Sequence, residues 1–463
     1  MKPPGYKARA SRKVQPAPRG KYLAGPRRQP GPTPCLEQIA QQELNSWSRS
    51  ILIVPSAPGV GPLPSPARGG LSICKIWDGD YPWDVRAEKV AAALTQHGHH
   101  VGMVARNRGR RPAIERLPEA TIYRLEPWPW APVWLDSAST FPAFFNPRWL
   151  RAIERTARRL EADLILCRDL PLAPAAIAVG EHLGRPVILD MAENYPAMLR
   201  SRRATGRARP LDWLVRNPTF ARRVEGWVLS RVAGVFVMVE ESRDRLIAEG
   251  VRKERIAVVS NTPPLSRLSG PMATHGEGPL QVVYLGLIEA QRGIETVLEA
   301  LALLKQEHFR IHLTIIGGGL ESEVFRDRAR HLGLDQSDVE FTGQLPNQLA
   351  LEMLPKAHVG LVPHWKDESW DTTVPNKLFD YMAAGLVVVT SNAAPAARIV
   401  TAADAGRVYA DRDPVALAAA LRSLQDPVER SRLARGGRQA ILDNYHWEAD
   451  VARMLALLEA VRR

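Results

Sequence analysis

The sequence predicts an α/β protein made of two doubly wound domains that face each other across a cleft. Three observations lead to this prediction. Short apolar, β-branched runs alternate with amphipathic helical stretches from residue 71 onward. These runs are apolar throughout, as strands buried on both faces of a parallel sheet must be. The chain of 463 residues is also longer than the roughly 250–300 residues at which a single core stops growing.

The expected strands fall into two groups, separated by a stretch rich in Pro, Gly and Ser from Asn261 to Pro279. Helical segments lie between most of them, and this β–α alternation is typical of Rossmann-like parallel sheets. The first group is Leu71–Trp77, Val101–Ala105, Ala120–Tyr123, Asp163–Cys167, Pro186–Leu189, Gly234–Val239 and Ile256–Val259. The second group is Gln281–Leu285, His312–Ile316, Val339–Thr342, Val359–Val362 and Leu386–Thr390.

The domain boundaries follow from the same changes in composition. Residues 1–70 are basic and Pro-rich, and we expect a disordered extension because they have too few apolar residues to offset the entropy of ordering. The expected order is then a first Rossmann-like domain at 71–262, a linker at 263–279, a second Rossmann-like domain at 280–443 and a closing helix at 444–463 that packs back on the first domain. Ligands of such sheets bind beyond the carboxyl ends of the strands, so we expect the chemistry in the cleft between the domains.

The net charge of +13 is concentrated in two places. Residues 1–50 hold ten basic and two acidic side chains, and the segment from Arg200 to Arg223 has eight arginines against Asp212 alone. Such clusters attract anionic lipid head groups, phosphorylated substrates or nucleic acid, and a solvated basic face is the plainer alternative. We expect an anionic membrane surface ahead of nucleic acid.

The cysteines and the apolar runs bear on location. Cys35, Cys74 and Cys167 are odd in number and widely scattered, which argues against a disulfide framework or a zinc pattern. The best apolar run, Val232 to Val239, is far shorter than a membrane-spanning helix, and no signal-peptide pattern opens the chain. We expect a cytoplasmic protein, peripheral at the inner membrane face.

The segment from Val374 to Gly385 is the strongest candidate for a binding site. Pro375 is suited to a first helical turn and Gly385 to a left-handed stop, which predicts a helix of about ten residues. Lys377 in the first turn opposes the helix dipole, unless an anion is bound there. The alternative is a surface ion pair between Lys377 and Asp380, worth about 0.3–0.5 kcal/mol.

Two further turns of the second half could hold a phosphate. Gly286 to Gly293 leaves a strand and enters a helix with Arg292 at its start, and arginine suits bidentate phosphate contact. Gly317 to Gly319 follows the next strand. Each turn alone is weak evidence, because glycine turns are common structural devices.

The first half offers weaker candidates. Asp78 and Asp80 imitate a carboxylate metal motif, but we expect Arg86, Glu88 or Lys89 to partner these charges, and no metal site is predicted. Asp190 and Glu193 follow a strand, where they could serve acceptor binding or acid–base chemistry, or merely cap a loop. The stretch from Trp128 to Trp149 is rich in Trp, Phe and Pro, and a local core is favoured over an amphiphile-binding lid.

Taken together, these residues resemble the family-4 retaining glycosyltransferases of the GT-B fold, from about Leu71 to the C-terminus. The features that carry the resemblance are Gly286, Arg292-Gly293, Ile315–Gly319, Phe341–Gln344, the Pro375–Gly385 segment and Tyr445–Trp447. The resemblance implies transfer of a sugar from a UDP- or GDP-type nucleotide sugar, with retention, to a glycan, lipid-linked or small-molecule acceptor. It makes 71–262 the acceptor domain and 280–443 the donor domain, with no cofactor and no metal.

The resemblance also implies roles for single residues. The donor pyrophosphate would meet Arg292 and the helix start at Asn376 and Lys377, the ribose would meet Asp380, and the base would meet Gln344 and Leu345. The predicted catalytic residues are Arg292, Lys377, Glu193 and Asp190; the predicted donor-binding residues are Gly286, Gly293, Gly317, Gly318, Gln344, Leu345, Thr373, Asn376 and Asp380.

Several positions depart from the family pattern, and two of them bear on catalysis. Thr372 stands where a glutamate is usual, and Ala192 stands where a catalytic histidine is frequent. The alternatives are therefore a non-catalytic binding or scaffold protein of this fold, or a nucleotide-sugar epimerase or phosphorylase.

Overall fold

The computed structural model describes residues 69–82, 84–128, 130–141, 143–204 and 217–462. The predicted disordered extension lies outside the described residues except for its last two positions. Cys35, Trp213 and the arginines at 207, 209 and 216 lie outside them as well.

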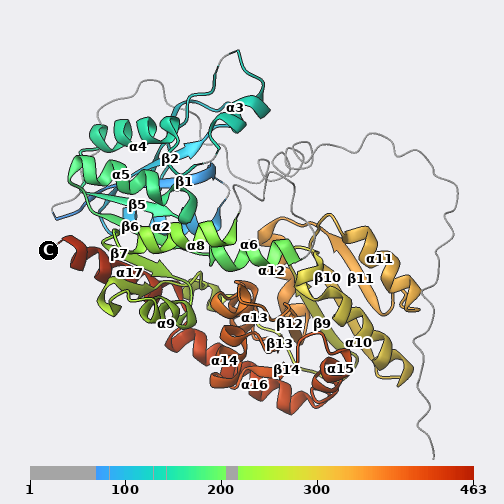
Figure 1. Ribbon diagram of the computed structural model, residues 1–463. Coiled ribbons are helices and arrows are strands. Elements are labelled where there is room, and N and C mark those ends of the chain that lie inside the picture. Colours follow the sequence, from blue (N-terminus) through green and yellow to red (C-terminus); the bar gives the residue numbers. More distant parts are fainter. Residues whose placement is uncertain (1–68, 83, 129, 142, 205–216, 463) are drawn as a thin grey trace, which may run out of the picture. The chain divides into compact units, whose positions relative to one another are not determined.

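The first domain is built on an eight-stranded sheet with the order β3-β4-β2-β1-β5-β6-β7-β8. Its strands β1, β2, β5, β6 and β7 are labelled in Figure 1. All neighbouring strands are parallel except β3, which pairs antiparallel with β4 at the edge. The strands are β1 (Ser72–Asp80), β2 (His100–Arg106), β3 (Ile114–Arg116), β4 (Thr121–Arg124), β5 (Leu164–Arg168), β6 (Val187–Met191), β7 (Gly234–Val237) and β8 (Ile256–Val258).

Helices cover both faces of this sheet. One face packs against Trp149, Ile177 and Val228 of three helices, and the other packs against Leu94 of α2 and Met454 of α17. The helices of this domain are α2 (Val85–Gln96), α3 (Val133–Ser139), α4 (Pro147–Arg159), α5 (Ala173–Leu183), α6 (Tyr195–Ala204), α8 (Pro218–Leu229) and α9 (Glu240–Ala248), with 3-10 turns η1 (Leu170–Leu172) and η2 (Lys253–Arg255).

The second domain has a six-stranded parallel sheet with the Rossmann order β11-β10-β9-β12-β13-β14. Its strands are β9 (Leu280–Leu285), β10 (Ile311–Ile316), β11 (Val339–Gly343), β12 (Val359–Val362), β13 (Val387–Ser391) and β14 (Gly406–Tyr409). Its helices are α10 (Ile294–Gln306), α11 (Ser322–His331), α12 (Asn347–Met353), α13 (Lys377–Ala383), α14 (Ala394–Ala402), α15 (Pro414–Arg422) and α16 (Pro427–Asp443). The 3-10 turns are η3 (Leu265–Ser269), η4 (Ala290–Arg292), η5 (Leu354–Lys356) and η6 (Trp370–Thr372).

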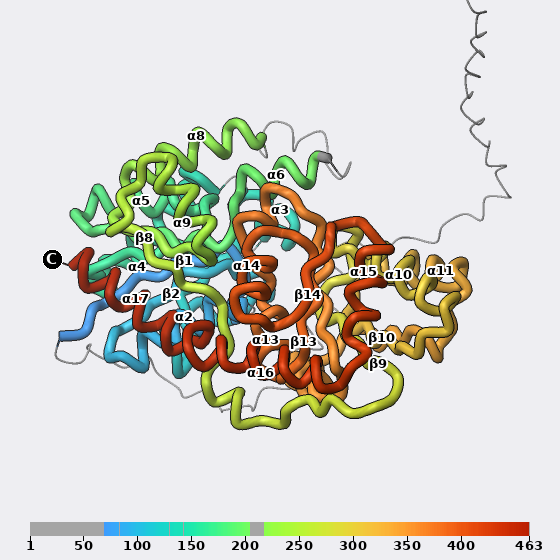
Figure 2. The backbone as a smooth tube through the Cα atoms, turned by 90° about the horizontal axis from the view of Figure 1, so that it is seen from below, coloured from blue at the N-terminus to red at the C-terminus, as the bar shows by residue number. Residues whose placement is uncertain are grey.

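The last helix, α17 (Trp447–Arg462), returns to the first sheet, and Figure 2 shows it beside α2. Its buried Leu457 packs against Gly234, where a Cβ would approach the leucine side chain to 3.0 Å. The carboxylate of its Asp450 accepts hydrogen bonds from the Ser260 backbone N–H and the Thr262 hydroxyl. These contacts fix the chain where it leaves the first domain.

The structure matches the predicted strands closely. Every expected strand overlaps an observed one, and the two that the sequence did not predict, β3 and β14, lie at sheet edges. The helix expected between Pro375 and Gly385 is shorter than predicted: α13 spans the seven residues Lys377–Ala383. Gly385 does adopt the expected left-handed conformation, with φ of 75°.

Candidate active site at the carboxyl ends of both sheets

The turns that leave β9, β10 and β12 meet at one edge of the second sheet. A Cβ on Gly317 would lie 1.9 Å from the Gly286 carbonyl oxygen, and a Cβ on Gly293 would lie 1.8 Å from the Pro363 carbonyl oxygen. Only glycine permits this approach, so the three turns form one compact surface. The surface lies at the switch point between β9 and β12, where doubly wound sheets bind their ligands.

Arg292 ends the short turn η4 on this surface. Its Nη1 lies 3.0 Å from His364 Nε2, and its guanidinium lies over the Trp370 ring at 4.9 Å. The nearest carboxylate is Glu289, at 3.9 Å from Nε. Arg292 is thus held in place by rings, and its one ion pair with a described residue is long.

Lys377 differs from Lys75, the other buried lysine without a hydrogen-bond partner among the described residues, in having no carboxylate that acts on its charge. Its side chain is buried, and its Nζ has no hydrogen-bond partner among them. The Nζ lies 3.8 Å from the centre of the Tyr284 ring and 3.0 Å from the position of a Cβ on Gly286. Burial, reinforced by the charge of Arg292, holds the pKa of this ammonium group well below its usual value. An anion bound between Arg292 and Lys377 would raise this pKa and would give the Nζ a hydrogen-bond acceptor.

The alternative prediction of a Lys377–Asp380 surface ion pair is wrong. Asp380 is paired with Arg267 of the linker at 2.9 Å, and burial raises its pKa against the opposing charges of Arg267 and Lys89. Lys377 is buried, and no described residue pairs with it.

His364 is a third basic group that sequence reasoning missed. It is buried, lies two residues after the end of β12 and contacts Trp370 with ring centroids 4.2 Å apart and ring planes tilted by 60°. Burial and the nearby charges of Lys377 and Arg292 keep its pKa well below the usual value, so the imidazole is neutral. Its position after a strand at the switch point was the only signal available in the sequence.

The other predicted donor residues lie around these cations. A Cβ on Gly318 would lie 3.6 Å from the Gln344 Cβ, so the turn after β10 meets the turn after β11. Leu345 packs on the core beneath, Thr373 is buried and Asn376 is exposed. The structure therefore brings the predicted glycines, Gln344, Arg292 and Lys377 to one edge, whereas Asp380 is held by the linker.

Most charged groups at the carboxyl edge of the first sheet are paired, although the buried Lys75 Nζ has no hydrogen-bond partner among the described residues. Asp78 accepts from Arg106 Nε at 2.6 Å, and Asp80 accepts from the Arg108 backbone N–H at 2.7 Å. The predicted partners Arg86, Glu88 and Lys89 were wrong. Lys89 instead donates to the Thr262 carbonyl oxygen at 2.5 Å.

Asp190 has no exposed surface. Its Oδ1 accepts from Arg86 Nε and Nη2 at 2.9 and 2.6 Å, while Arg86 Nη1 also donates to the Val259 carbonyl oxygen at 2.8 Å. Burial alone would raise the pKa of Asp190, but Arg86, Lys75 and Arg168 bring it below its usual value. In this geometry Asp190 supports its neighbours and is shielded from the cleft.

Glu193 is half-buried on the loop after β6. Burial and Asp169 raise its pKa to about 7, while Arg292 of the other domain acts in the opposite direction. The next residue, Asn194, donates from Nδ2 to Thr372 Oγ1 at 3.2 Å. Glu193 thus stands where the two domains approach each other, with a proton that it can give or take near neutral pH.

Asp169 was not predicted and lies directly beneath Glu193. It follows β5 with φ of 63°, a conformation that residues other than glycine rarely adopt outside functional sites. Its Oδ1 accepts from the Ala192 backbone N–H at 3.2 Å. Burial raises its pKa to about 6 against the charge of Arg168, with Asp190 adding to the increase.

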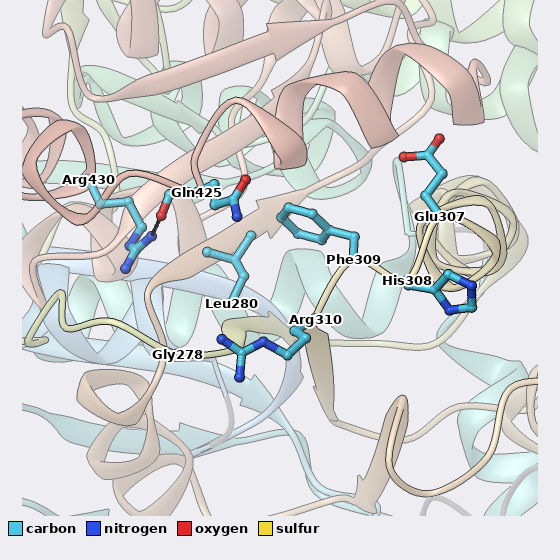
Figure 3. A pocket seen from close by; sticks show the side chains of 8 residues that line it. All are labelled: Gly278, Leu280, Glu307, His308, Phe309, Arg310, Gln425 and Arg430. Carbon is cyan, nitrogen blue, oxygen red and sulfur yellow. Dashed lines mark hydrogen bonds between the residues drawn. The ribbon is translucent and has the colours of Figure 1, made fainter.

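A separate pocket of about 270 Å³ lies at the amino ends of β9 and β10, away from these groups (Figure 3). Its Arg430 donates to the carbonyl oxygens of Leu424, Gln425 and Gly276, which assigns this side chain to holding the linker and a helix end. The pocket is lined by Gly278, Leu280, Glu307, His308, Phe309, Arg310, Gln425 and Arg430.

Two features are absent from the part of the chain that the structure describes. Across residues 69–462, apart from the gaps given above, no three His, Cys, Asp or Glu side chains are grouped as they would be around a metal ion. None of the described helices is both long and apolar enough to cross a bilayer.

Comparison with known proteins agrees with this arrangement. Residues 84–262 match the family model of the glycosyl transferase 4-like domain, and residues 279–426 match that of the glycosyl transferases group 1. Glycogen synthase of Mycobacterium tuberculosis is 26% identical over 314 residues, covering 66% of this chain and 71% of that protein. Phosphatidyl-myo-inositol mannosyltransferase of Mycolicibacterium smegmatis is 28% identical over 183 residues, covering 39% and 45%.

Solved structures share the fold. Sucrose-phosphate synthase from Thermosynechococcus elongatus superposes with a TM-score of 0.65 at 20% identity, covering 84% of this chain and 99% of that one. Anabaena HepE, solved in complex with UDP, gives a TM-score of 0.63 at 14% identity, covering 84% and 100%. The fold is therefore GT-B.

The two family models together span most of residues 84–426, and they fall on the two Rossmann-like domains in turn. The chain belongs to the group 1 family of glycosyltransferases. The predicted fold class and family are confirmed.

Proposed function

We propose that this glycosyltransferase moves a sugar from a UDP- or GDP-type nucleotide sugar, with retention of configuration, to a glycan, lipid-linked or small-molecule acceptor. The observation that carries the proposal is the buried Lys377 Nζ beside Arg292, which has no partner among the described residues. Burying a cation without a counter-charge is unfavourable, so the arrangement is best explained by an anionic ligand. A diphosphate has the required charge.

In this proposal Arg292 and Lys377 stabilise the negative charge that develops on the departing diphosphate. The glycines at 286, 293, 317 and 318 allow backbone N–H groups to approach it closely. Gln344 and Leu345 would border the base, Thr373 and Asn376 would complete the diphosphate contacts, and Asp380 would leave Arg267 to reach the ribose. Two protein cations supply the positive charge, so the proposed reaction needs no metal and no cofactor.

On the acceptor side we assign Glu193 to proton transfer and Asp190 to positioning. Glu193 is half-buried beside Arg292, whereas Asp190 is fully buried and held by Arg86. The structures of HepE with UDP and with UDP-glucose support a uridine donor, since their fold is shared. The buried free thiols Cys74 and Cys167 are compatible with the proposed cytoplasmic location.

Calorimetric titration with UDP and with GDP tests the proposal. We expect Arg292→Ala and Lys377→Ala each to raise the Kd of the nucleotide that binds at least tenfold, about 1.4 kcal/mol. Lys305→Ala is the matched control, because Lys305 forms an ion pair with Asp338 at 2.5 Å on the far side of α10. Unchanged affinity in both site variants would refute the assignment.

A non-catalytic role is the second candidate, and Thr372 favours it. Its hydroxyl is engaged with Asn194 Nδ2 and with the Glu368 and Ser369 carbonyl oxygens, where a longer carboxylate would reach into the cleft. Incubation of the protein with nucleotide sugars, followed by NMR, separates the cases. Binding without turnover on any acceptor would support the scaffold role, and conversion of the donor alone would support an epimerase.

A further inference from the structure

One region of the first domain exposes aromatic side chains. Every exposed phenylalanine and tryptophan of the described residues lies between residues 130 and 145 or in α8. The exposed fractions are 73% for Trp130, 60% for Trp134, 49% for Phe141, 56% for Phe145 and 46% for Phe220. We call these five residues the aromatic surface. The prediction that this stretch packs as a local core holds for Trp149, which is buried, and is wrong for Trp130 and Trp134.

Ring contacts join the two parts of this surface. Phe144 meets Phe220 edge-on at 5.7 Å between ring centroids, and Phe145 meets Trp227 at 6.0 Å. Helix α3, which carries Trp134, contains no buried residue. A seven-residue helix with no fully buried residue gains little from packing in water, and its exposed Val133 and Trp134 side chains are free to meet a lipid surface.

Arginines surround the aromatic surface. Arg222 and Arg223 are exposed on α8 beside Phe220, and Arg110 donates to the Ala131 carbonyl oxygen next to α3. Arg148 and Arg231 lie over the rings of Trp128 and Trp227 at 5.0 and 4.3 Å, and they are paired with Asp136 and Glu181 at 2.8 and 3.7 Å. The nearby carboxylates of Glu126 and Glu154 are paired with Arg155 and Arg158.

Aromatic rings framed by cations have the composition of a surface that lies in a membrane interface. Trp and Phe rings settle at the head-group level, and arginines are attracted to anionic lipids. A second copy of this chain would instead bring the same arginines against one another. The charge therefore favours an anionic bilayer over self-association.

Two hydrogen bonds connect the aromatic surface to the carboxyl edge of the first sheet. Arg106 at the end of β2 donates from Nη1 to the Thr140 hydroxyl, one residue before Phe141, and from Nε to Asp78 at the end of β1. Asp78 lies on the same carboxyl edge of the sheet as the loop of Glu193. A bilayer that meets the aromatic surface would present its acceptor at this edge.

We propose that the aromatic surface inserts into the interface of an anionic lipid bilayer and so delivers a lipid-linked acceptor to the carboxyl edge of the first sheet. The identity of the acceptor rests on the proposed function, whereas membrane binding itself does not.

Flotation of the full chain with phosphatidylcholine vesicles, with and without phosphatidylglycerol, tests the proposal. We expect the wild type to float with anionic vesicles, and the double variants Trp130→Ser/Trp134→Ser and Phe141→Ser/Phe145→Ser to lose at least tenfold in partition coefficient. Leu320→Ser/Val428→Ser is the matched control, because these side chains are 71% and 73% exposed outside the aromatic surface. Residues 1–50 are present in every variant, so their basic charge does not affect the comparison.

Several results would overturn the proposal: no flotation of the wild type, equal flotation of the double variants, or equal loss in the control. A concentration-dependent dimer that the same variants abolish would assign the surface to a second copy. Calorimetry with UDP and GDP on the same variants keeps the two hypotheses apart. Retained nucleotide binding with lost flotation supports the surface, and absent nucleotide binding in all proteins would refute the proposed function alone.

Discussion

The carboxyl edges of the two sheets handle buried charge in opposite ways. In the first domain Arg86 and Asp190 form a closed pair, with Lys75 and Arg168 close by. In the second domain Lys377 has no hydrogen-bonding partner among the described residues and Arg292 has only a distant carboxylate. The first edge places carboxylates among its buried cations, although the Lys75 Nζ and Asp190 Oδ2 have no hydrogen-bond partner among the described residues, whereas no described carboxylate acts on the charge of Lys377 at the second edge. The two edges thus differ in the carboxylates that accompany their buried cations.

The largest expected effect comes from breaking the buried ion pair between Arg86 and Asp190 at the first edge. Asp190→Ala would leave Arg86 and Lys75 buried without their counter-charge, so we expect the free energy of unfolding to fall by about 3–5 kcal/mol. Thermal and denaturant unfolding measure this. Asp335→Ala is the control, because its pair with Lys305 is exposed to solvent and should contribute little to stability. Equal effects of the two substitutions would contradict the description of the first edge.

A substitution at the second edge should change the free energy of unfolding in the opposite direction. Lys377→Met removes a buried amine whose charged form is disfavoured by burial and by Arg292, so the ligand-free protein should keep its stability or gain up to about 1–3 kcal/mol. Unfolding of the same preparations without nucleotide measures it. A loss as large as that of Asp190→Ala would mean that Lys377 has a structural partner.

A smaller effect concerns pH. The pKa of Glu193 is raised to about 7 in the folded protein, from about 4.5 in the unfolded chain, so the folded state binds more protons between these values. Stability should therefore fall as pH rises from about 4.5 to 7. Glu193→Gln should flatten this decline, as followed by unfolding at a series of pH values. An identical slope in the variant would show that Glu193 titrates normally, and Asp169, with a pKa of about 6, contributes in the same direction.

The fold was largely predictable because its strands are apolar and β-branched, and the exceptions are instructive. β3 (Ile114–Arg116) and β14 (Gly406–Tyr409) contain charged residues. Both are edge strands, so each has a neighbouring strand on one side only and is less enclosed by apolar residues than a central strand. Gly406 lies so close to Val388 that a Cβ would approach its carbonyl oxygen to 1.7 Å. That constraint arises from pairing with β13 and is invisible in the local sequence.

A residue of the candidate site could be predicted from the sequence where its charge is unfavourable at its position in the predicted helix. Lys377 contradicts the polarity of a helix start, and that local conflict is enough to single it out. His364 and Asp169 conflict with nothing nearby in the sequence. Their importance comes from burial beside Arg292 and beneath Glu193, and both neighbours are distant along the chain. The partners of Asp78 and Asp380 were unpredictable for the same reason.

The central claim is that Lys377 and Arg292 form a site that is completed by a nucleoside diphosphate. Titration of UDP and GDP at pH 8 in buffers of different ionisation enthalpy tests it most directly. Because the pKa of Lys377 is depressed in the free protein and an anion would raise it, one of these nucleotides should bind with net proton uptake, and this uptake should disappear in Lys377→Met. Absence of binding by either nucleotide, or uptake that persists unchanged in the variant, would contradict the claim.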